Sequence, residues 1–349
     1  MKIFRYTLAF LLALALLVSS FGCGYAPVKS SEEELATVLR LDGTYDVPYE
    51  LYRFYFLSEL ALSEQDPSKL SGEEKEALFA ELHQKTLEEI ADVYAILKLC
   101  EAHGIDVESK EFDEYVEDNI TYAVEGSGEY VGYGDHETYL AEIKKAYMND
   151  SVFRFLLRYR RAEEKLGALL RDTGVLKSDR ETVLSYMNSD DCVRVSWIYI
   201  PYTVLPGYTS NVLELMEAEA KAATDEEFLA MTHRVIPDAY TDEQLDIGFY
   251  IGKHQLDPYY DALTETAFSL APGETSGWID SGDGRYLVRR LPKDARYLAE
   301  ESNLADFTEY YLLESFYGML AEEAERLAST VSLTDAFGGL TFDTVKMPE

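Results

Sequence analysis

The stretch from Ala267 to Arg290, AFSLAPGETSGWIDSGDGRYLVRR, constrains the fold of this chain more than any other. An apolar helix end runs into a break at Pro272-Gly273, and two short apolar segments then flank Asp283-Gly284. Proline and glycine interrupt regular structure, and an Asp-Gly pair between apolar segments favours a hairpin. The stretch therefore predicts a helix followed by two paired strands.

The residues before this stretch predict the rest of a small domain. Apolar strands are expected over Val193–Tyr199 and Gln244–Ile251. Between them, Thr224 and Glu227 have the spacing of a capping box, in which each side chain accepts from the other's backbone N–H. The expected helices of this region are Asn211–Ala223, Asp225–His233 and Pro258–Leu270. The resulting order, β-α-α-β-α-β-β over roughly 100 residues, has the size of one domain.

Amphipathic helices dominate the remainder of the chain. Val38–Leu41 and Tyr45–Val47 predict a small hairpin, and Pro48 favours the start of a helix. The apolar periodicity predicts helices over Glu73–His103, Ser109–Val124, Glu137–Met148 and Ser151–Leu170. A last helix, Asn303–Val331, carries an apolar stripe that needs a partner, which we expect to be the N-terminal helices. The expected fold class is α+β, mainly helical.

The N-terminus has the pattern of a secretory signal. Lys2 and Arg5 precede the apolar run Leu8–Val18, which is too short for a comfortable membrane span. Gly22-Cys23 resembles the end of a lipoprotein signal, in which the cysteine receives a diacylglycerol and becomes the mature N-terminus. We therefore expect residues 1–22 to be removed, Cys23 to be lipidated, and residues 23–36 to tether the protein outside a bacterial membrane. The alternative is ordinary signal cleavage nearby, with Cys23 unmodified.

Composition excludes several classes of partner. The chain holds 65 acidic against 31 basic residues, and the signal contains only basic ones, so the mature protein repels nucleic acid and anionic lipid surfaces. Its five histidines show no ligand spacing and no acidic calcium loop is present, so a metal site is not expected. Cys100 and Cys192 are expected as buried thiols, with a disulfide between them as the alternative.

Three motifs carry a resemblance to a known family. Ala267–Arg290 aligns without a gap to the closing segment of parvulin-type peptidyl-prolyl isomerases, which reads roughly aF-x-L-x-x-G-E-x-S-x-x-V-x-T-x-x-G-x-H-I-I. Arg194–Tyr199, RVSWIY, resembles the family's first strand, R-A-S-H-I-L, and Leu245–Gly248, LDIG, resembles its G-D-L-G motif. The family accelerates rotation about X-Pro bonds, whose barrier is about 18–20 kcal/mol, in an apolar pocket that needs no cofactor.

The resemblance implies a set of site residues. The expected catalytic residues are Trp197 and Tyr286, at the places of the family's two histidines, and Asp238, in register with its Asp or Cys. The expected substrate-binding residues, which correspond to apolar positions of the family, are Leu256, Tyr260 and Phe268. Tyrosine offers a hydrogen-bond donor and an acceptor, as neutral histidine does, whereas tryptophan offers a donor only.

A further resemblance concerns Glu101–Val116, EAHGIDVESKEFDEYV. It is similar to a chaperone-domain pattern of the SurA and PrsA foldases, in which the isomerase domain is inserted within a split helical domain. The resemblance implies a helical chaperone lobe over 37–191 and a parvulin-like domain over 192–296. A C-terminal helix and tail over 297–349 are then expected to return to the helical lobe.

Taken with the signal, the resemblance implies a membrane-anchored foldase that assists secreted proteins by acting on unfolded, proline-containing segments. The loop Pro201–Ser210 contains no Lys or Arg, so a preference for phosphopeptides is not expected. Because both family histidines are replaced, a non-catalytic holdase of the same architecture is the first alternative. A solute- or polymer-binding envelope lipoprotein is the second.

Overall fold

The computed structural model describes residues 25–128, 130–235, 247–254 and 260–347. The chain divides into two compact units: unit 1 comprises Met1–Asp172 and Met319–Glu349, and unit 2 comprises Thr173–Gly318. Both units combine helices with a small antiparallel sheet, so the expected α+β class is confirmed. Within the described ranges, no helix has the length and apolar character needed to cross a membrane.

Unit 1 is built mainly from helices packed through apolar side chains. They are η1 (Pro67–Lys69), α2 (Tyr49–Ser63), α3 (Gly72–Ala102), α4 (Lys110–Glu125), α5 (His136–Lys145) and α6 (Asp150–Asp172). A further long helix, α12 (Glu301–Ala328), begins in unit 2 and ends in unit 1. Leu78, Leu82 and Ile90 of α3 are buried at helical spacing, as the apolar periodicity predicts.

Helix α3 begins and ends where its sequence provides caps. The Glu74 carboxylate accepts from the Ser71 N–H at 2.8 Å, and Ser71 Oγ accepts from the Glu74 N–H at 3.4 Å. Gly104 follows the helix with φ at +73°, a conformation that glycine adopts without steric cost. The predicted helix over Glu73–His103 is therefore confirmed to within about two residues.

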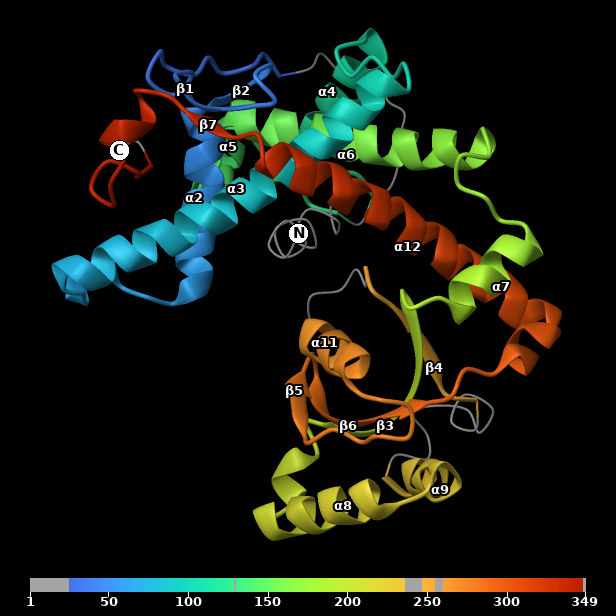
Figure 1. The fold of residues 1–349 in the computed structure, drawn as a ribbon. Coiled ribbons are helices and arrows are strands. Elements are labelled where there is room, and N and C mark those ends of the chain that lie inside the picture. Colours follow the sequence, from blue (N-terminus) through green and yellow to red (C-terminus); the bar gives the residue numbers. More distant parts are fainter. Residues whose placement is uncertain (1–24, 129, 236–246, 255–259, 348–349) are drawn as a thin grey trace. The chain divides into compact units, whose positions relative to one another are not determined.

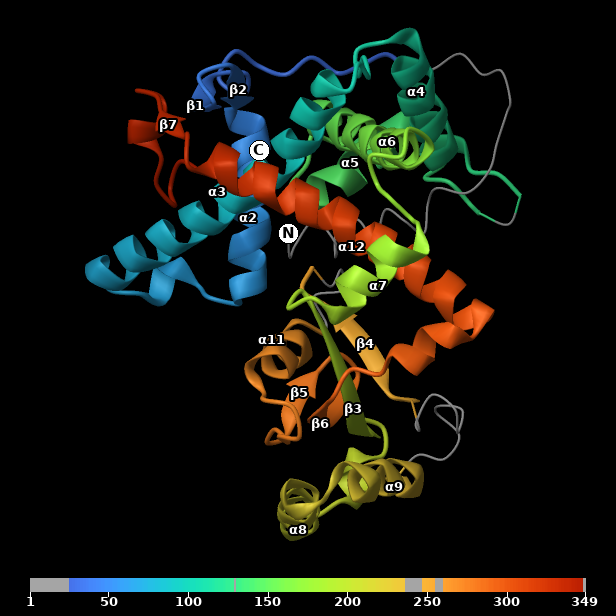
Figure 2. The same ribbon diagram turned by 45° about the vertical axis from the view of Figure 1, so that its right-hand side comes forward.

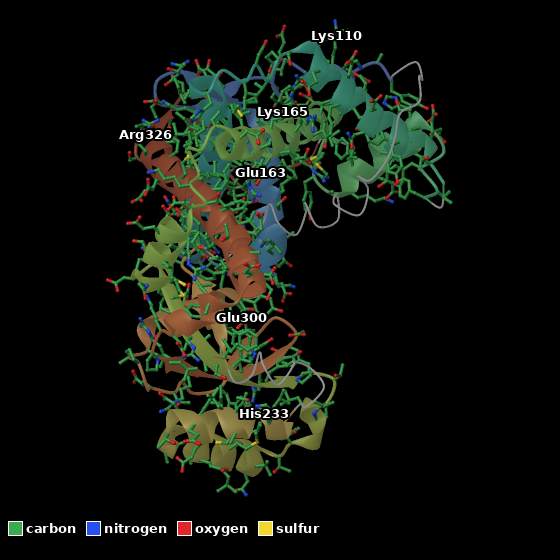
Figure 3. All side chains as sticks on the ribbon, turned by 90° about the vertical axis from the view of Figure 1, so that its right-hand side faces the viewer. Lys110, Glu163, Lys165, His233, Glu300 and Arg326 are labelled. Carbon is green, nitrogen blue, oxygen red and sulfur yellow. The ribbon has the colours of Figure 1, made fainter. Side chains whose placement is uncertain are left out.

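Ion pairs link α4 and α6 on the surface of unit 1. Lys165 Nζ lies 2.5 Å from Glu111, and Arg158 Nη2 lies 2.7 Å from Asp113. Figure 3 labels Lys165 on α6 and Lys110 at the start of α4. Exposed pairs of this kind contribute only about 0–1 kcal/mol each, so the apolar contacts between the helices hold this part of the unit together.

A three-stranded sheet joins the two ends of unit 1. It consists of β1 (Thr37–Leu41), β2 (Tyr45–Pro48) and β7 (Ser332–Leu333), in the order β2-β1-β7, and Figure 2 shows the three side by side. Asp42, Gly43 and Thr44 connect β1 to β2, and Asp42 and Gly43 have φ at 52° and 65°, the left-handed region that tight hairpin turns use. The predicted hairpin is confirmed. The pairing of Leu39 with Leu333 was not predicted, because a two-residue strand leaves no pattern in the sequence.

The segment expected as a tether lies against unit 1 from Tyr25 onward. The Tyr25 ring stacks on His136 with the ring centroids 5.0 Å apart, and Arg154 donates to the Tyr25 carbonyl at 2.7 Å. The Val28 N–H donates to a carboxylate oxygen of Asp150, a buried residue, at 2.8 Å. These residues therefore belong to the folded unit.

Unit 2 is organised around a four-stranded antiparallel sheet. Its strands, in the order β4-β3-β6-β5, are β3 (Cys192–Pro201), β4 (Phe249–Gly252), β5 (Ile279–Ser281) and β6 (Gly284–Leu291). The remaining elements are α7 (Arg180–Asn188), η2 (Leu205–Gly207), α8 (Ser210–Ala222), α9 (Asp225–Val235), α11 (Asp261–Ser269) and η4 (Ala295–Ala299). From β3 to β6 the described elements follow the predicted order of strands and helices.

The two faces of this sheet carry different helices. Val193 and Val195 of β3 point to one face, where they pack in a cluster with Leu263 of α11. The alternate residue Ile198 points to the other face and packs with Phe228 of α9. Figure 1 shows α11 on one side of the sheet, and α8 with α9 on the other. The α11 face also carries aromatic side chains, and α11 covers them only in part.

Helix α7 was not predicted, and it groups with unit 2. It packs against β3 and α12 in a buried cluster formed by Val183, Met187, Cys192, Leu298 and Phe307. The resemblance to the foldases implied that residues 180–188 belong to the helical lobe. The signal for the helix is Asp179, whose side chain caps it by accepting from the Thr182 N–H at 3.0 Å.

The two cysteines of the described chain are free thiols. Cys100 and Cys192 are both buried, as expected, so the disulfide alternative is wrong. Burial raises the pKa of each thiol to about 12. Both thiols are therefore protonated at neutral pH and have little nucleophilic character.

Candidate functional site

Aromatic side chains converge on Tyr286 on the α11 face of the unit 2 sheet. Strand register places Tyr286 of β6 opposite Tyr199 of β3, and their rings stack with centroids 4.8 Å apart. Trp197 meets Tyr286 edge-on at 6.0 Å and lies flat on Phe249 of β4 at 3.9 Å. The Tyr260 ring meets Tyr286 edge-on at 6.4 Å. We call these five residues the sheet aromatic cluster.

Helix α11 covers one side of the cluster. It begins directly after Tyr260, and its side chains Leu263 and Ala267 are buried against the sheet. Phe268, at the far end of the helix, packs against the same core but remains half-buried. A proline or other apolar side chain bound here would therefore meet rings from three strands and the start of a helix.

The cluster is anchored at its centre and open at its rim. Tyr286 is only 3% exposed, whereas Trp197, Tyr199, Phe249 and Tyr260 are each half-buried. Aromatic rings contribute large contact areas while losing little conformational entropy, because they rotate about only two side-chain bonds. A half-exposed group of such rings on a rigid sheet is typical of a binding surface.

One carboxylate organises the polar edge of the cluster. Tyr199 Oη donates to Asp283 at 2.5 Å, and Tyr286 Oη donates to the other oxygen of the same carboxylate at 3.1 Å. Asp283 is exposed in the turn between β5 and β6. Gly284 follows it, and a Cβ there would stand 2.4 Å from the Ile200 carbonyl oxygen. The close approach of β3 and β6 at this turn therefore requires the glycine.

The structure brings together part of the predicted site. Trp197 and Tyr286 are in contact, and Tyr260 reaches Tyr286 from the start of α11. Phe268 belongs to the same apolar core but has no ring contact with these three among the described interactions. Asp238, Leu256 and Cys23 lie outside the described residues, so their predicted roles remain predictions.

Tyr199, Phe249 and Asp283 were not predicted as site residues from the sequence. The alternation that places Trp197 on the α11 face also places Tyr199 there, so Tyr199 could have been found from the strand pattern. Asp283 was named only as part of a turn, although a turn next to Tyr286 brings its carboxylate within reach of that ring. Phe249 depends on the pairing of β4 with β3, which no local pattern specifies.

The arrangement of these residues suits the binding of a ligand. Five aromatic rings form an apolar surface, and two phenol hydroxyls and one carboxylate border it. Such a surface suits extended peptide segments with proline or aromatic side chains, because each apolar group buried contributes about 25 cal/mol per Å². The hydroxyls and the carboxylate supply hydrogen-bonding groups for a polypeptide backbone at the rim.

Neither a protein-family model nor a curated protein matches the chain. Solved structures do match it. The chain is similar to PrsA foldases. The foldase protein PrsA of Streptococcus pneumoniae is 16% identical, with 73% of this chain and 88% of that chain covered and a TM-score of 0.27. PrsA of Bacillus subtilis is 15% identical, with 72% and 86% covered and a TM-score of 0.26. The foldase protein PrsA of Lactococcus lactis is 11% identical, with 89% and 100% covered and a TM-score of 0.24.

Proposed function

We propose that this chain is an extracytoplasmic chaperone of the foldase type, which binds proline-containing segments of unfolded polypeptides at the sheet aromatic cluster. The observation that carries the proposal is that three half-buried rings contact the buried Tyr286, and a fourth, Phe249, stacks on one of them, Trp197. The resemblance of Ala267–Arg290 to the parvulin isomerases supports the same ligand class. The acidic composition suits unfolded polypeptides rather than polyanions.

Intrinsic fluorescence can test this binding directly. The chain has two tryptophans: Trp197 in the cluster and Trp278, which packs on the opposite face of the sheet. In a Trp278→Phe variant, all tryptophan emission comes from Trp197. Titration with a proline-containing tetrapeptide, Ala-Ala-Pro-Phe, is expected to change this emission saturably. The same titration of a Trp197→Phe variant, which reports from Trp278, is expected to change little.

Two variants test whether the sheet aromatic cluster is the surface that binds the peptide. Tyr260→Ala removes a half-buried ring from the cluster and is expected to weaken peptide binding about tenfold, which corresponds to about 1.4 kcal/mol. Leu215→Ala is the matched control, because Leu215 lies on α8 and is 63% exposed. Equal affinities for both variants, or an unchanged Trp197 signal at saturating peptide, would exclude the cluster as the site.

Prolyl isomerisation at the same surface is a second candidate function, and one observation favours it. The Tyr199–Asp283–Tyr286 hydrogen bonds place a donor and acceptor network beside the apolar rings. Uncatalysed X-Pro rotation takes tens to hundreds of seconds, so an apolar site that weakens amide resonance can accelerate it without a nucleophile.

A protease-coupled proline-peptide assay separates binding from isomerisation. If the network participates, Asp283→Ala is expected to lower turnover at least tenfold while Ala-Ala-Pro-Phe still binds to the cluster. A Glu274→Ala variant serves as the control, because it removes an exposed carboxylate of the same unit that accepts from the Ala271 N–H. Turnover equal to the uncatalysed rate in the unaltered protein would exclude this candidate and retain the binding function. Suppressed aggregation of an unfolded client by the same sample would then identify a holdase.

We also propose that Cys23 carries the lipid anchor. Tyr25 is docked on α5 and α6, and two residues of extended chain span at most about 7 Å. An anchored protein would therefore hold the docked end of unit 1 next to the membrane surface. Cys23→Ala is expected to move the protein from the membrane fraction to the soluble fraction, as measured by immunoblotting. Unchanged membrane association would exclude Cys23 as the anchor.

A further inference from the structure

A second aromatic surface, in unit 1, is occupied by the C-terminal end of the chain. Tyr52 and Phe56 of α2, together with Phe79 and His83 of α3, form what we call the α2–α3 surface. Each pair has the i, i+4 spacing that places two side chains on one helix face. Tyr52 Oη and His83 Nδ1 lie 3.2 Å apart and join the two helices.

Residues 332–347, which we call the tail, place two phenylalanines on this surface. Phe337 lies with its ring centroid 4.6 Å from His83 and 5.8 Å from Tyr52. Phe342 lies 5.3 Å from Phe79 and 5.7 Å from Phe56. The short helix η5 (Phe337–Gly339) separates the two contacts. Figure 1 shows this red segment beside α2.

The tail is also held as an added strand. Its β7 residues pair with β1, with Leu333 opposite Leu39, and the Thr334 N–H donates to the Val38 carbonyl at 3.1 Å. Thr334 Oγ1 donates to the Thr37 carbonyl at 2.6 Å. Addition of an extended chain to a sheet edge, with side chains placed in neighbouring pockets, is a general mode of peptide recognition.

From these contacts we infer that the β1 edge and the α2–α3 surface form a second polypeptide-binding site, which the tail occupies in cis. The ligand class is an extended, unfolded segment with two aromatic residues about five positions apart, because the tail itself provides that pattern at 337 and 342. The inference rests on the proposed function for the kind of ligand, an unfolded polypeptide, but it concerns a separate surface in unit 1. The tail is then an autoinhibitory segment that clients displace.

The contacts of the tail suit a displaceable segment. Both residues of β7 are exposed, and Phe337 and Phe342 are only half-buried. A single buried side chain, Val345, anchors the far end, and the Tyr49 hydroxyl donates to the Thr344 carbonyl there at 2.8 Å. A segment linked in cis has an effective concentration in the millimolar range, so a weak contact is enough to block free peptide.

A labelled peptide with the tail's own sequence, SLTDAFGGLTFDTVKM, provides the test. Fluorescence anisotropy is measured with the mature chain and with a Phe337→Ala/Phe342→Ala variant, whose own tail is weakened while the α2–α3 surface is intact. The variant is expected to bind the peptide at least tenfold more tightly than the unaltered protein. Thr334→Ala, which removes a tail hydrogen bond without changing either ring, is expected to show a smaller gain.

Matched controls locate the site and separate it from the sheet aromatic cluster. A peptide with alanine at both phenylalanine positions is expected not to bind. Phe79→Ala, added to the double variant, is expected to abolish binding, whereas Tyr260→Ala in unit 2 leaves it unchanged. Binding of the tail peptide to unit 1 can therefore be observed even if the sheet aromatic cluster in unit 2 binds no peptide.

The role of clients is tested by competition. A reduced, carboxymethylated protein that stays unfolded is expected to displace the labelled peptide from the double variant. Equal peptide affinity in the unaltered protein and both tail variants would overturn the inference. Peptide binding without displacement by the client would also overturn it, because the surface would then be a latch for the tail alone. Concentration-dependent dimerisation through exchanged tails, seen by sedimentation, would assign the surface to a second copy instead.

Discussion

The aromatic surfaces of the two units differ in what covers them. In unit 2, strand register collects the sheet aromatic cluster around Tyr286, and α11 covers it on one side only. In unit 1, helical spacing collects the α2–α3 surface, and the chain's own tail places Phe337 and Phe342 on it. The first surface is open at its rim, whereas the second is occupied.

The two surfaces therefore differ in what holds their aromatic rings in position. The cluster in unit 2 gains its order from the sheet, so its rings keep their positions without a ligand. The α2–α3 surface makes its outer contacts with a short segment whose own strand has two residues. We therefore expect unit 2 to respond strongly to changes in its buried centre, and unit 1 to respond to loss of the tail.

The largest effect is expected from Tyr286→Ala. Removal of a ring that is 3% exposed leaves a cavity and is expected to lower the free energy of unfolding of unit 2 by about 3–5 kcal/mol. Both tryptophans lie in unit 2, so urea denaturation followed by tryptophan fluorescence reports this unit. Tyr286→Phe keeps the ring and loses the bond to Asp283, with an expected loss of about 1 kcal/mol. Similar losses in both variants would contradict the central packing role of the ring.

Deletion of residues 332–349 is expected to have the next largest effect, in unit 1. It removes two half-buried phenylalanines and the buried Val345, which together contribute about 2–3 kcal/mol. Far-UV circular dichroism in urea would show this loss of stability. The urea midpoint of the tryptophan fluorescence transition, which reports unit 2, is expected to stay unchanged. A chain shortened by only its last two residues is the control. A shift of the tryptophan transition as large as that of unit 1 would contradict the separation of the two surfaces.

Glu59→Gln tests a polar position on the same α2 helix. Glu59 is buried, and burial followed by the nearby Glu89 carboxylate raises its pKa from the usual value to about 7. The folded state thus holds a proton that the unfolded state releases above about pH 4.5, so unit 1 loses stability as the pH rises toward 7. The glutamine variant is expected to be more stable by about 1–2 kcal/mol at pH 8 and nearly unchanged at pH 4. Thermal melts of both proteins at pH 4 and pH 8 would measure this difference in stability. Equal stabilisation at the two pH values would refute the raised pKa of Glu59.

The smallest effect concerns His83 beside Phe337. Burial lowers the pKa of His83, so the folded state disfavours the charged form and stability falls as the pH drops below about 6.5. Tail deletion exposes this ring, and an NMR titration is expected to show a higher His83 pKa in the shortened chain. The associated change in stability is expected to be below about 1 kcal/mol. An unchanged His83 pKa would show that the tail does not cover the ring in solution.

The sequence predicted elements whose local signals are strong. The capping box at Thr224 and Glu227, the turn at Asp42-Gly43 and the break at Pro272-Gly273 each specify backbone geometry within a few residues. Helix α7 was missed because its nine residues form less than three turns, with two buried apolar positions. The short strand β7 has no local signal at all.

The amino-acid sequence by itself determined the class of this protein's fold and the order of strands and helices from β3 to β6, because caps, turns and apolar periodicity act over a few residues. It also placed Trp197, Tyr260 and Tyr286 in one site through a resemblance. Only the tertiary structure decided that Asp283 binds two tyrosine hydroxyls and that the tail lies on the α2–α3 surface. Contacts of this kind join residues far apart in the chain, and strand register and tertiary packing determine them.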